Sequence, residues 1–241
     1  MPRGRVRTTD TMNKRSEKPN TKKKVAESLR KRILRELVAW TWVLAAFLLI
    51  QGTLLQARVI PTGSMERTLL IGDHLLVSRF GYDAELPFTG LHVKLWRDPV
   101  RGQLIVFRAP VPGASDYIKR VIGVPGDRIE IRAGIVRVNS EPLVESYRNA
   151  APDPHENFGP VTVPAGRYFV LGDNRANSYD SRYWGFVPRE NLIGTPLVIY
   201  MSVDAPEQAW QPGQIQERVL AYLNAAVRPR LVRWSRLFTT F

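Results

Sequence analysis

A serine in a turn-like segment and a lysine in a strand-like segment have the most notable chemistry in this chain of 241 residues. Ser64 follows Pro61 and Gly63, of which proline stiffens the backbone and glycine lets it come close to a ligand. A serine hydroxyl becomes a nucleophile only when a base takes its proton. Lys119 is a candidate base, because desolvation can lower the pKa of a lysine by several units and leave its amine neutral.

Histidine is the more usual base beside a catalytic serine, and the chain has three histidines. His74 begins a strand-like run, while His92 and His155 lie in polar or proline-rich loops, and none has neighbours that suggest a triad. Lys119 is followed by Arg120, and strand alternation places these two cations on opposite faces. Two ordinary interpretations stay open on these residues alone, a loop serine without function and a lysine that reaches water from a strand edge.

A third segment, residues 172–188, is dense in turn-forming, charged and aromatic residues directly after a strand-like run. Polar loops of this kind often carry function. The segments Ile60–Leu69, Tyr117–Asp127 and Gly172–Pro188, in this order, resemble the conserved boxes of the bacterial type I signal peptidases, also called leader peptidases, a family of Ser-Lys dyad serine peptidases. The resemblance covers about residues 58–200, and the combination of the three segments is highly specific.

The resemblance implies that Ser64 is the nucleophile and that Lys119, kept neutral by burial, is the general base. It also implies that the hydroxyl of Thr62 and the backbone N–H of Ser64 form the oxyanion hole. The hydroxyl of Ser178 would bond the lysine amine and fix its direction, and Asp180 and Arg182 would be a supporting ion pair. The remaining matched positions would wall shallow apolar pockets for small side chains, which gives Ala-x-Ala specificity; they are Ile60, Pro61, Met65, Leu69 and Ile118.

The chain departs from the family pattern at two positions. Arg67 stands where a proline is common, and Ala176 replaces an acidic residue in the last segment. Neither position has an implied catalytic role, so the departures concern local loop geometry rather than the chemistry.

The elements that must position these residues are short strands. Runs rich in Val, Ile, Phe and Tyr recur between Gly, Pro, Asp and Asn, and they predict strands over residues 74–79, 103–108, 117–122, 128–132, 135–139, 167–171 and 193–201. Helical periodicity is almost absent from 58 to 205, so we predict a mainly β, antiparallel peptidase domain over 58–205. Ala133-Gly134 predicts a tight hairpin. The resemblance implies a small inserted β region over about 126–163.

The N-terminal part predicts a membrane anchor. Residues 37–55 contain no charge and would span roughly 28 Å as a helix, close to the ~30 Å hydrocarbon core. Residues 1–36 carry 13 Lys and Arg against 4 Asp and Glu, so we predict a disordered basic tail in the cytoplasm, a transmembrane helix over 37–57 and the peptidase domain outside. A cleaved signal peptide fits poorly, because the basic region is too long and no A-x-A-like site follows. A buried core helix is the other alternative.

Composition and charge exclude several classes of site and partner. The net charge of +13 belongs to the two ends of the chain, since residues 37–212 carry 17 basic and 17 acidic residues. This distribution argues against a nucleic-acid partner and favours an anionic membrane surface. The chain has no cysteine, which excludes disulfides and thiolate metal sites. No metal, nucleotide or other cofactor signature is present.

The C-terminal segment, 206–241, predicts an amphipathic helix that Pro229 interrupts, followed by apolar residues interleaved with arginines. It could lie on a membrane surface or dock on the domain, and both interpretations stay open.

The resemblance implies a signal peptidase of the bacterial plasma membrane, whose partners are preprotein signal peptides, membrane phospholipid and the protein export machinery. Three alternatives remain. A self-cleaving repressor-type Ser-Lys peptidase would need a DNA-binding domain in place of the uncharged run at 37–55. The others are a non-catalytic single-pass membrane scaffold and a processing peptidase with few substrates.

Overall fold

A computed structural model describes residues 21–82, 84–85, 92–93, 98–111 and 115–241, without the side chains of 21–29, 48–53, 84–85 and 92–93. The chain forms two units, one up to Phe47 and one from Leu48 to Phe241.

The first unit contains most of helix α1 (Thr21–Thr53). Its start corrects the predicted tail over 1–36, because the Lys, Arg, Leu and Glu residues after Thr21 have good helix propensity and continue the helix. Residues 1–20 of that tail lie outside the described part. The predicted end at residue 57 is also wrong, since Leu55–Val59 forms strand β1 and pairs with β2 from Leu55 against Ser78 to Val59 against His74.

No helix in the described part of the chain combines the length and the hydropathy that crossing a membrane requires. The predicted transmembrane segment over 37–57 includes residues 48–53, whose side chains lie outside that part.

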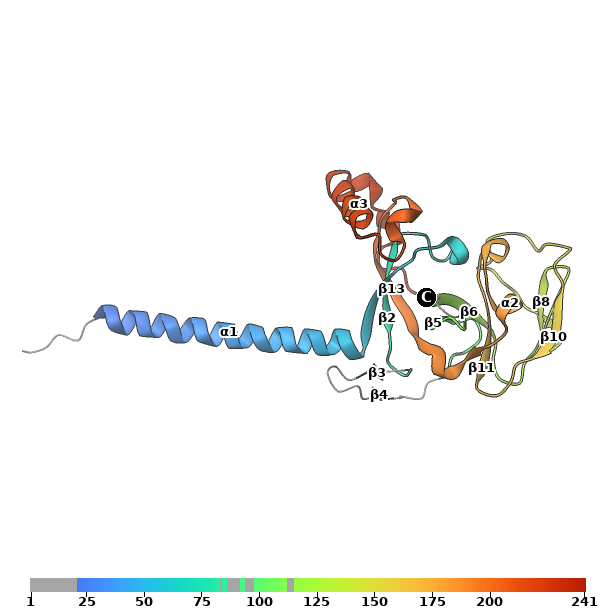
Figure 1. Cartoon of the computed structure of the whole chain (residues 1–241), viewed down its shortest axis with the longest axis horizontal. Helices are drawn as coiled ribbons and strands as arrows, with labels where there is room; N and C mark the ends of the chain where they lie inside the picture. The colour runs from blue at the N-terminus through green and yellow to red at the C-terminus, as the bar shows by residue number, and fades with distance from the viewer. Residues whose placement is uncertain (1–20, 83, 86–91, 94–97, 112–114) are drawn as a thin grey trace, which may run out of the picture. The chain divides into compact units, whose positions relative to one another are not determined.

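The second unit is built on an antiparallel seven-stranded sheet, which confirms the predicted mainly β, antiparallel fold (Figure 1). Its strand order is β1-β2-β13-β5-β6-β11-β12. After β1, the strands are β2 (Asp73–Ser78), β5 (Leu104–Phe107), β6 (Tyr117–Gly123), β11 (Arg167–Leu171), β12 (Val187–Pro188) and β13 (Leu192–Ser202). Each predicted strand of this sheet is present within about one residue of its expected bounds.

A separate four-stranded sheet, of order β10-β7-β8-β9, lies beyond β11 and α2 (Ser181–Trp184) in Figure 1. Its strands are β7 (Arg128–Arg132), β8 (Ile135–Val138), β9 (Glu141–Pro142) and β10 (Phe158–Thr162), all within the range predicted for the insert. The β7–β8 hairpin turns at Ala133 (φ 47°) and Gly134 (φ 72°), as a two-residue turn with positive φ requires. A two-stranded pair joins β3 (Ala84–Glu85) and β4 (His92–Val93).

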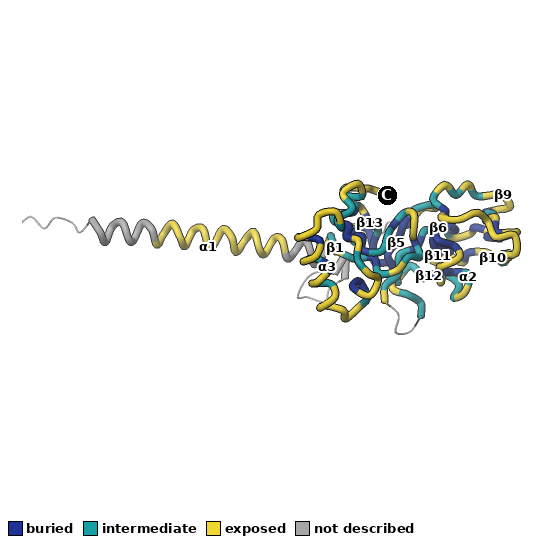
Figure 2. Tube along the Cα trace, turned by 90° about the horizontal axis from the view of Figure 1, so that it is seen from above, coloured by how far each residue is buried: buried dark blue, intermediate teal, exposed yellow. Residues whose placement is uncertain are grey.

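The core lies on both faces of the central strands, which are dark blue in Figure 2. On β5, Leu104 and Val106 belong to one apolar cluster, while Ile105 and Phe107 belong to the other. This alternation follows from the two-residue period of a strand. Strand β6, next to β5, is therefore covered on both faces.

Short helices complete the unit: η1 (Gly63–Met65), η2 (Arg175–Asn177), η3 (Arg189–Asn191), η4 (Glu207–Trp210), α3 (Ile215–Val227), η5 (Pro229–Leu231) and η6 (Trp234–Arg236). The last four form the C-terminal segment, where the apolar spacing predicted a helix. Arg236 ties this segment to the sheet, because its guanidinium pairs with the fully buried carboxylate of Asp73 on β2 at 2.6 Å.

Candidate active site

Ser64 lies in the single turn η1 between β1 and β2. Thr62 directly before the turn is exposed and extended, at φ −136° and ψ 154°. Asn174 holds the turn through two hydrogen bonds: its backbone N–H donates to the carbonyl of Ser64 at 3.1 Å, and its side-chain amide donates to the carbonyl of Gly63 at 3.1 Å. The last sequence segment therefore fixes the backbone of the first.

Lys119 reaches Ser64 from the third residue of β6. Its Nζ donates a hydrogen bond to the Oγ of Ser64 at 2.6 Å, and only 4% of the residue is exposed. Strand pairing fixes the position of Lys119 in the sheet, since Lys119 lies opposite Ile105 of β5. Two residues 55 positions apart in the chain thus meet because β6 is an interior strand of the sheet.

Burial lowers the pKa of Lys119 to about 8. Removal from water disfavours the ammonium form and outweighs the opposing attraction of the Asp180 and Asp173 carboxylates. At pH 7.4 about a fifth of the amine is then neutral, against about 0.1% for an exposed lysine. The amine can therefore accept a proton from Ser64 near neutral pH.

Ser178 is buried beside this pair and lines the same cleft, but its Oγ has no hydrogen-bond partner among the described residues. The implied bond from Ser178 to the lysine amine is therefore not formed in this structure. Gly172 makes room for Ser178, because a Cβ on Gly172 would lie 2.2 Å from the Oγ of Ser178 and 2.6 Å from the carbonyl oxygen of Ser64. The packing at this point tolerates only glycine.

Asp180 and Arg182 form the ion pair that the resemblance implies, with 2.8 Å between the Arg182 Nε and an Asp180 carboxylate oxygen. The Asp180 carboxylate is fully buried and also accepts from the backbone N–H groups of Gly172 and Arg182. Arg182 continues to Glu156 in the four-stranded sheet region. The pair therefore fastens the loop that carries Ser178.

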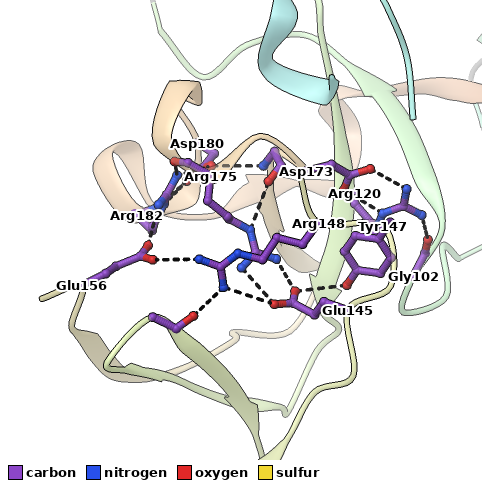
Figure 3. Close-up of polar contacts among 12 residues, drawn as sticks. Gly102, Arg120, Glu145, Tyr147, Arg148, Glu156, Asp173, Arg175, Asp180 and Arg182 are labelled. Atoms are coloured by element: carbon purple, nitrogen blue, oxygen red, sulfur yellow. Dashed lines mark hydrogen bonds and ion pairs between the residues drawn. The ribbon is translucent and has the colours of Figure 1, made fainter. Parts of the chain in front are cut away.

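A network of buried charges surrounds this loop (Figure 3). Arg120 donates to both carboxylate oxygens of Asp173, at 2.9 and 2.6 Å, and its guanidinium stacks 4.0 Å from the centre of the Tyr147 ring. Arg175 pairs with Glu145 in the same network. The sequence indicated that Arg120 is a cation on a strand, on the face opposite Lys119, but it predicted none of these partners.

A cleft of about 830 Å³ opens over Ser64 and Lys119. Four of the residues implied to bind substrate line it, namely Ile60, Pro61, Met65 and Ile118. Leu69 is not among the lining residues: it is 0% exposed and packs in the apolar cluster behind the cleft. Thr62 and the exposed Ala176 also line the opening.

Arg67 adopts a left-handed conformation at φ 84°, and it donates to the backbone carbonyl of Arg148. A proline ring fixes φ near −65°, so the family's common proline could not adopt this turn. Arg67 therefore gives this loop a backbone conformation that a proline at the same position could not adopt.

The described residues that line the cleft include no histidine. His74 is buried, and its ring contacts the carbonyl of Gly72 and the hydroxyl of Tyr222. His155 is exposed, and the side chain of His92 lies outside the described part. Within that part, no three His, Asp or Glu side chains gather as metal ligands would.

The sequence reasoning missed two kinds of residue. Asn174 and Gly172 lie in the recognised last segment, and their positions beside Ser64 carried no signal in one sequence. Glu207, Trp210 and Arg218 line the cleft from the C-terminal segment, which sequence patterns left without a role. Only the folded chain brings that segment to the site.

Comparisons with known proteins show the family of the chain. The family described as "Signal peptidase, peptidase S26" matches residues 33–201. A probable signal peptidase I-2 of Synechocystis sp. is 40% identical over 195 residues, which cover 75% of this chain and 80% of the relative. Signal peptidase I of Pseudomonas fluorescens is 35% identical over 207 residues, covering 70% and 73%.

A crystal structure of a signal peptidase I from Enterococcus faecalis is 36% identical and covers 41% of this chain and 97% of its own, with a TM-score of 0.37. The assignment rests on the sequence matches, of which the family match spans residues 33–201, a range that contains Ser64, Lys119 and Ser178. The chain therefore belongs to the signal peptidase family, peptidase S26.

Proposed function

We propose that this chain is a serine endopeptidase that removes N-terminal signal peptides from exported preproteins, with Ser64 as nucleophile and Lys119 as general base. The observation that carries the proposal is the 2.6 Å hydrogen bond between a buried lysine of lowered pKa and a serine at the floor of a cleft. The names of the relatives supply the substrate class.

In the proposed reaction, neutral Lys119 takes the hydroxyl proton as the Oγ of Ser64 attacks the scissile carbonyl carbon. The C–N bond then breaks, and the lysine ammonium gives that proton to the leaving amine of the mature protein. The signal peptide remains as an ester on Ser64. Lys119, neutral again, takes a proton from water, whose oxygen attacks the ester carbonyl. The proton returns to the Ser64 oxygen when the ester C–O bond breaks.

The oxyanion that forms in both steps needs hydrogen-bond donors. We assign this role to the backbone N–H of Ser64 and the hydroxyl of Thr62, which lines the cleft next to the nucleophile. Each donor placed at the developing charge lowers the barrier by about 3–4 kcal/mol. Asn174, which holds the carbonyls of Gly63 and Ser64, keeps the turn in the orientation that such donors require.

The proposed cleavage site has the form small-x-small, as in Ala-x-Ala. Ile60, Pro61, Met65 and Ile118 wall the cleft beside the nucleophile, and Ile60 and Met65 are nearly fully buried. Leu69 supports this wall from behind. Because Ile60 and Met65 are packed in the core, they cannot move aside for a bulky substrate residue.

We further propose a single membrane anchor over the uncharged stretch of α1, residues 37–53, in the bacterial plasma membrane. The basic residues before it favour a cytoplasmic N-terminus and an extracytoplasmic peptidase domain. Ser64 lies nine residues after Leu55, at most ~30 Å of extended chain. Phospholipid and the export machinery would be partners there. When protease is added to spheroplasts, we expect the N-terminal tail to be protected from digestion. Digestion of the tail would instead indicate the reverse topology.

The test of the activity is cleavage of a purified preprotein in detergent, with the cut site determined by mass spectrometry. The wild type should release the mature protein after a small-x-small site. Ser64→Ala should be inactive. Ser115→Ala is a matched control, because Ser115 lines the same cleft, is exposed and has no assigned role.

Each other outcome has a distinct meaning. Equal loss in both serine variants would show that the cleft, rather than the Ser64 hydroxyl, is what matters. Full activity of Ser64→Ala would exclude this nucleophile. A wild type that leaves generic preproteins intact but cuts one dedicated substrate would replace a general signal peptidase by a specialised one.

A further inference from the structure

Helix α3 at the end of the peptidase unit has two apolar faces, and only one of them is covered. Ala221 and Ala225 are buried against Val203 and Trp210, and Tyr222 packs partly into the same cluster. The opposite face is apolar as well and is exposed; it consists of Ile215 (70% exposed), Val219, Leu220, Leu223 (59%) and Val227 (80%). An outward helix face of a soluble domain is normally polar.

The helix is fixed in place, so this exposure is not a consequence of loose packing. The hydroxyl of Tyr222 lies 2.7 Å from the Nε2 of His74 on β2. Arg218 donates to the backbone carbonyls of Ala209, Trp210 and Gln211 at 3.2–3.4 Å. The covered face is therefore held by both apolar and polar contacts, and the outward face is a constant feature of the fold.

Basic and aromatic residues follow the helix directly. Arg228 and Arg230 are exposed at its C-terminal end. Trp234 is 64% exposed, and its indole N–H donates to the carbonyl of Pro229, which places the ring beside this end. An apolar helix face with arginines and a tryptophan at its border has the chemistry of an interfacial helix, whose cations meet lipid phosphates.

The size of the face argues against a second copy of this chain as its occupant. A helix of 13 residues is about 20 Å long, and a strip about 10 Å wide along it covers only about 200 Å². A stable dimer needs about 800 Å² per partner. A bilayer accepts a strip of any length, and anionic headgroups complement Arg228 and Arg230.

We propose that the outward face of α3 lies in the interfacial layer of an anionic phospholipid bilayer, with Arg228 and Arg230 at the lipid phosphates. This inference rests on the proposed function, since a bilayer is where a signal peptide would be met. The same C-terminal segment contributes Trp210, Pro212 and Arg218 to the wall of the cleft. Docking of α3 therefore holds this wall of the cleft close to the membrane, where a cleavage site emerges.

The chain has no cysteine, which allows a direct test on the full chain. Leu223→Cys places an environment-sensitive fluorophore on the outward face, and Asn224→Cys is the matched control, because Asn224 is exposed on the polar side of the same turn. Both labelled proteins are reconstituted into phosphatidylcholine vesicles with and without phosphatidylglycerol. Lipids that carry a shallow spin label then quench any fluorophore in the interface.

We expect the label at position 223 to be quenched about twofold or more in vesicles with phosphatidylglycerol, and the label at 224 to be quenched little. Arg228→Glu with Arg230→Glu should weaken the quenching at 223. Equal, weak quenching at both positions would overturn the proposal. A blue-shifted label at 223 that lipid does not quench would also overturn it, because a protein would then cover the face. Cleavage of a preprotein in detergent is measured separately, so loss of the proposed activity is distinguished from loss of docking.

Discussion

Two neighbouring cations on β6 have opposite surroundings. Arg120 donates to both oxygens of the Asp173 carboxylate and to the carbonyl of Gly102, and it stacks on the ring of Tyr147. Lys119 donates to a neutral hydroxyl, that of Ser64. Both lie in the interior of one sheet, but a carboxylate compensates only one of them directly.

The difference shows how one strand can serve structure and chemistry together. The paired guanidinium keeps its charge and holds the loop of the last sequence segment through Asp173. The lysine lacks a paired carboxylate, so burial lowers its pKa and yields a base. The predictions below test each half of this comparison, from the largest expected effect to the smallest.

Replacement of the base should have the largest effect. Lys119→Ala should lower kcat by about 10⁴-fold or more, since removal of one member of a catalytic unit removes most of its action. Lys119→Arg should be equally inactive, because a guanidinium does not release its proton near neutral pH. The measurement is single-turnover cleavage of a preprotein with folding checked by circular dichroism. Activity in Lys119→Arg would contradict the assignment of a neutral base.

Removal of the carboxylate charge that compensates Arg120 should destabilise the fold rather than inactivate the catalytic pair. Asp173→Asn leaves a buried guanidinium without its counter-charge, and we expect the free energy of unfolding to fall by about 3–5 kcal/mol. The double variant with Arg120→Met should recover part of this loss. Denaturant titration of the three proteins measures both changes. No recovery in the double variant would mean that the pair is not the cause.

Addition of one methyl group at Gly172 should disturb the packing between the turn that carries Ser64 and the loop that carries Ser178. A Cβ there meets the Oγ of Ser178 and the carbonyl of Ser64, so Ser178, the turn η1 or both must shift. We expect Gly172→Ala to lower kcat/KM by about 10- to 100-fold. Gly123→Ala is the control for crowding, because its Cβ would lie 2.8 Å from the side chain of Ile129, and neither glycine has a positive φ. Equal losses in both variants would assign the effect to crowding of the core rather than to the contact with Ser64 and Ser178.

Removal of the buried amine should stabilise the protein. The folded-state pKa of Lys119, about 8, lies below its unfolded value of 10.5, so the unfolded chain holds the proton more tightly. The resulting penalty on the free energy of folding is full below pH 8 and is lost as the pH rises to 10.5. Lys119→Met should therefore raise the free energy of unfolding by about 1–3 kcal/mol at pH 7. The gain should shrink as pH rises from 8 to 10.5. A destabilised Lys119→Met at pH 7 would show that the hydrogen bond to Ser64 outweighs burial.

The pH dependence of cleavage should follow the same group. We expect kcat/KM to rise about tenfold per pH unit below 8 and to level off above it, as the Lys119 amine becomes neutral. Initial rates at low substrate concentration between pH 6 and 10 measure the profile. An inflection near pH 6.5 would instead indicate a histidine.

Strand positions were predictable because alternation and turn residues are local signals. The run 128–132 and the turn at Ala133-Gly134 were read directly from residue types, and the structure agrees with both. The end of α1 was not predictable in this way. The apolar residues after Thr53 suit a helix as well as a strand, and only pairing with β2 selects the strand.

The sequence by itself determined which residues have the chemistry of the site, since Ser64, Lys119 and the last segment carry recognisable patterns. Tertiary structure decided what those residues touch. The pKa of Lys119, the Arg120–Asp173 pair and the hydrogen bonds from Asn174 to η1 depend on burial and on contacts between residues 53 to 111 positions apart. Residue type sets which charges are available, while desolvation and distance, which exist only in the folded chain, set how those charges behave.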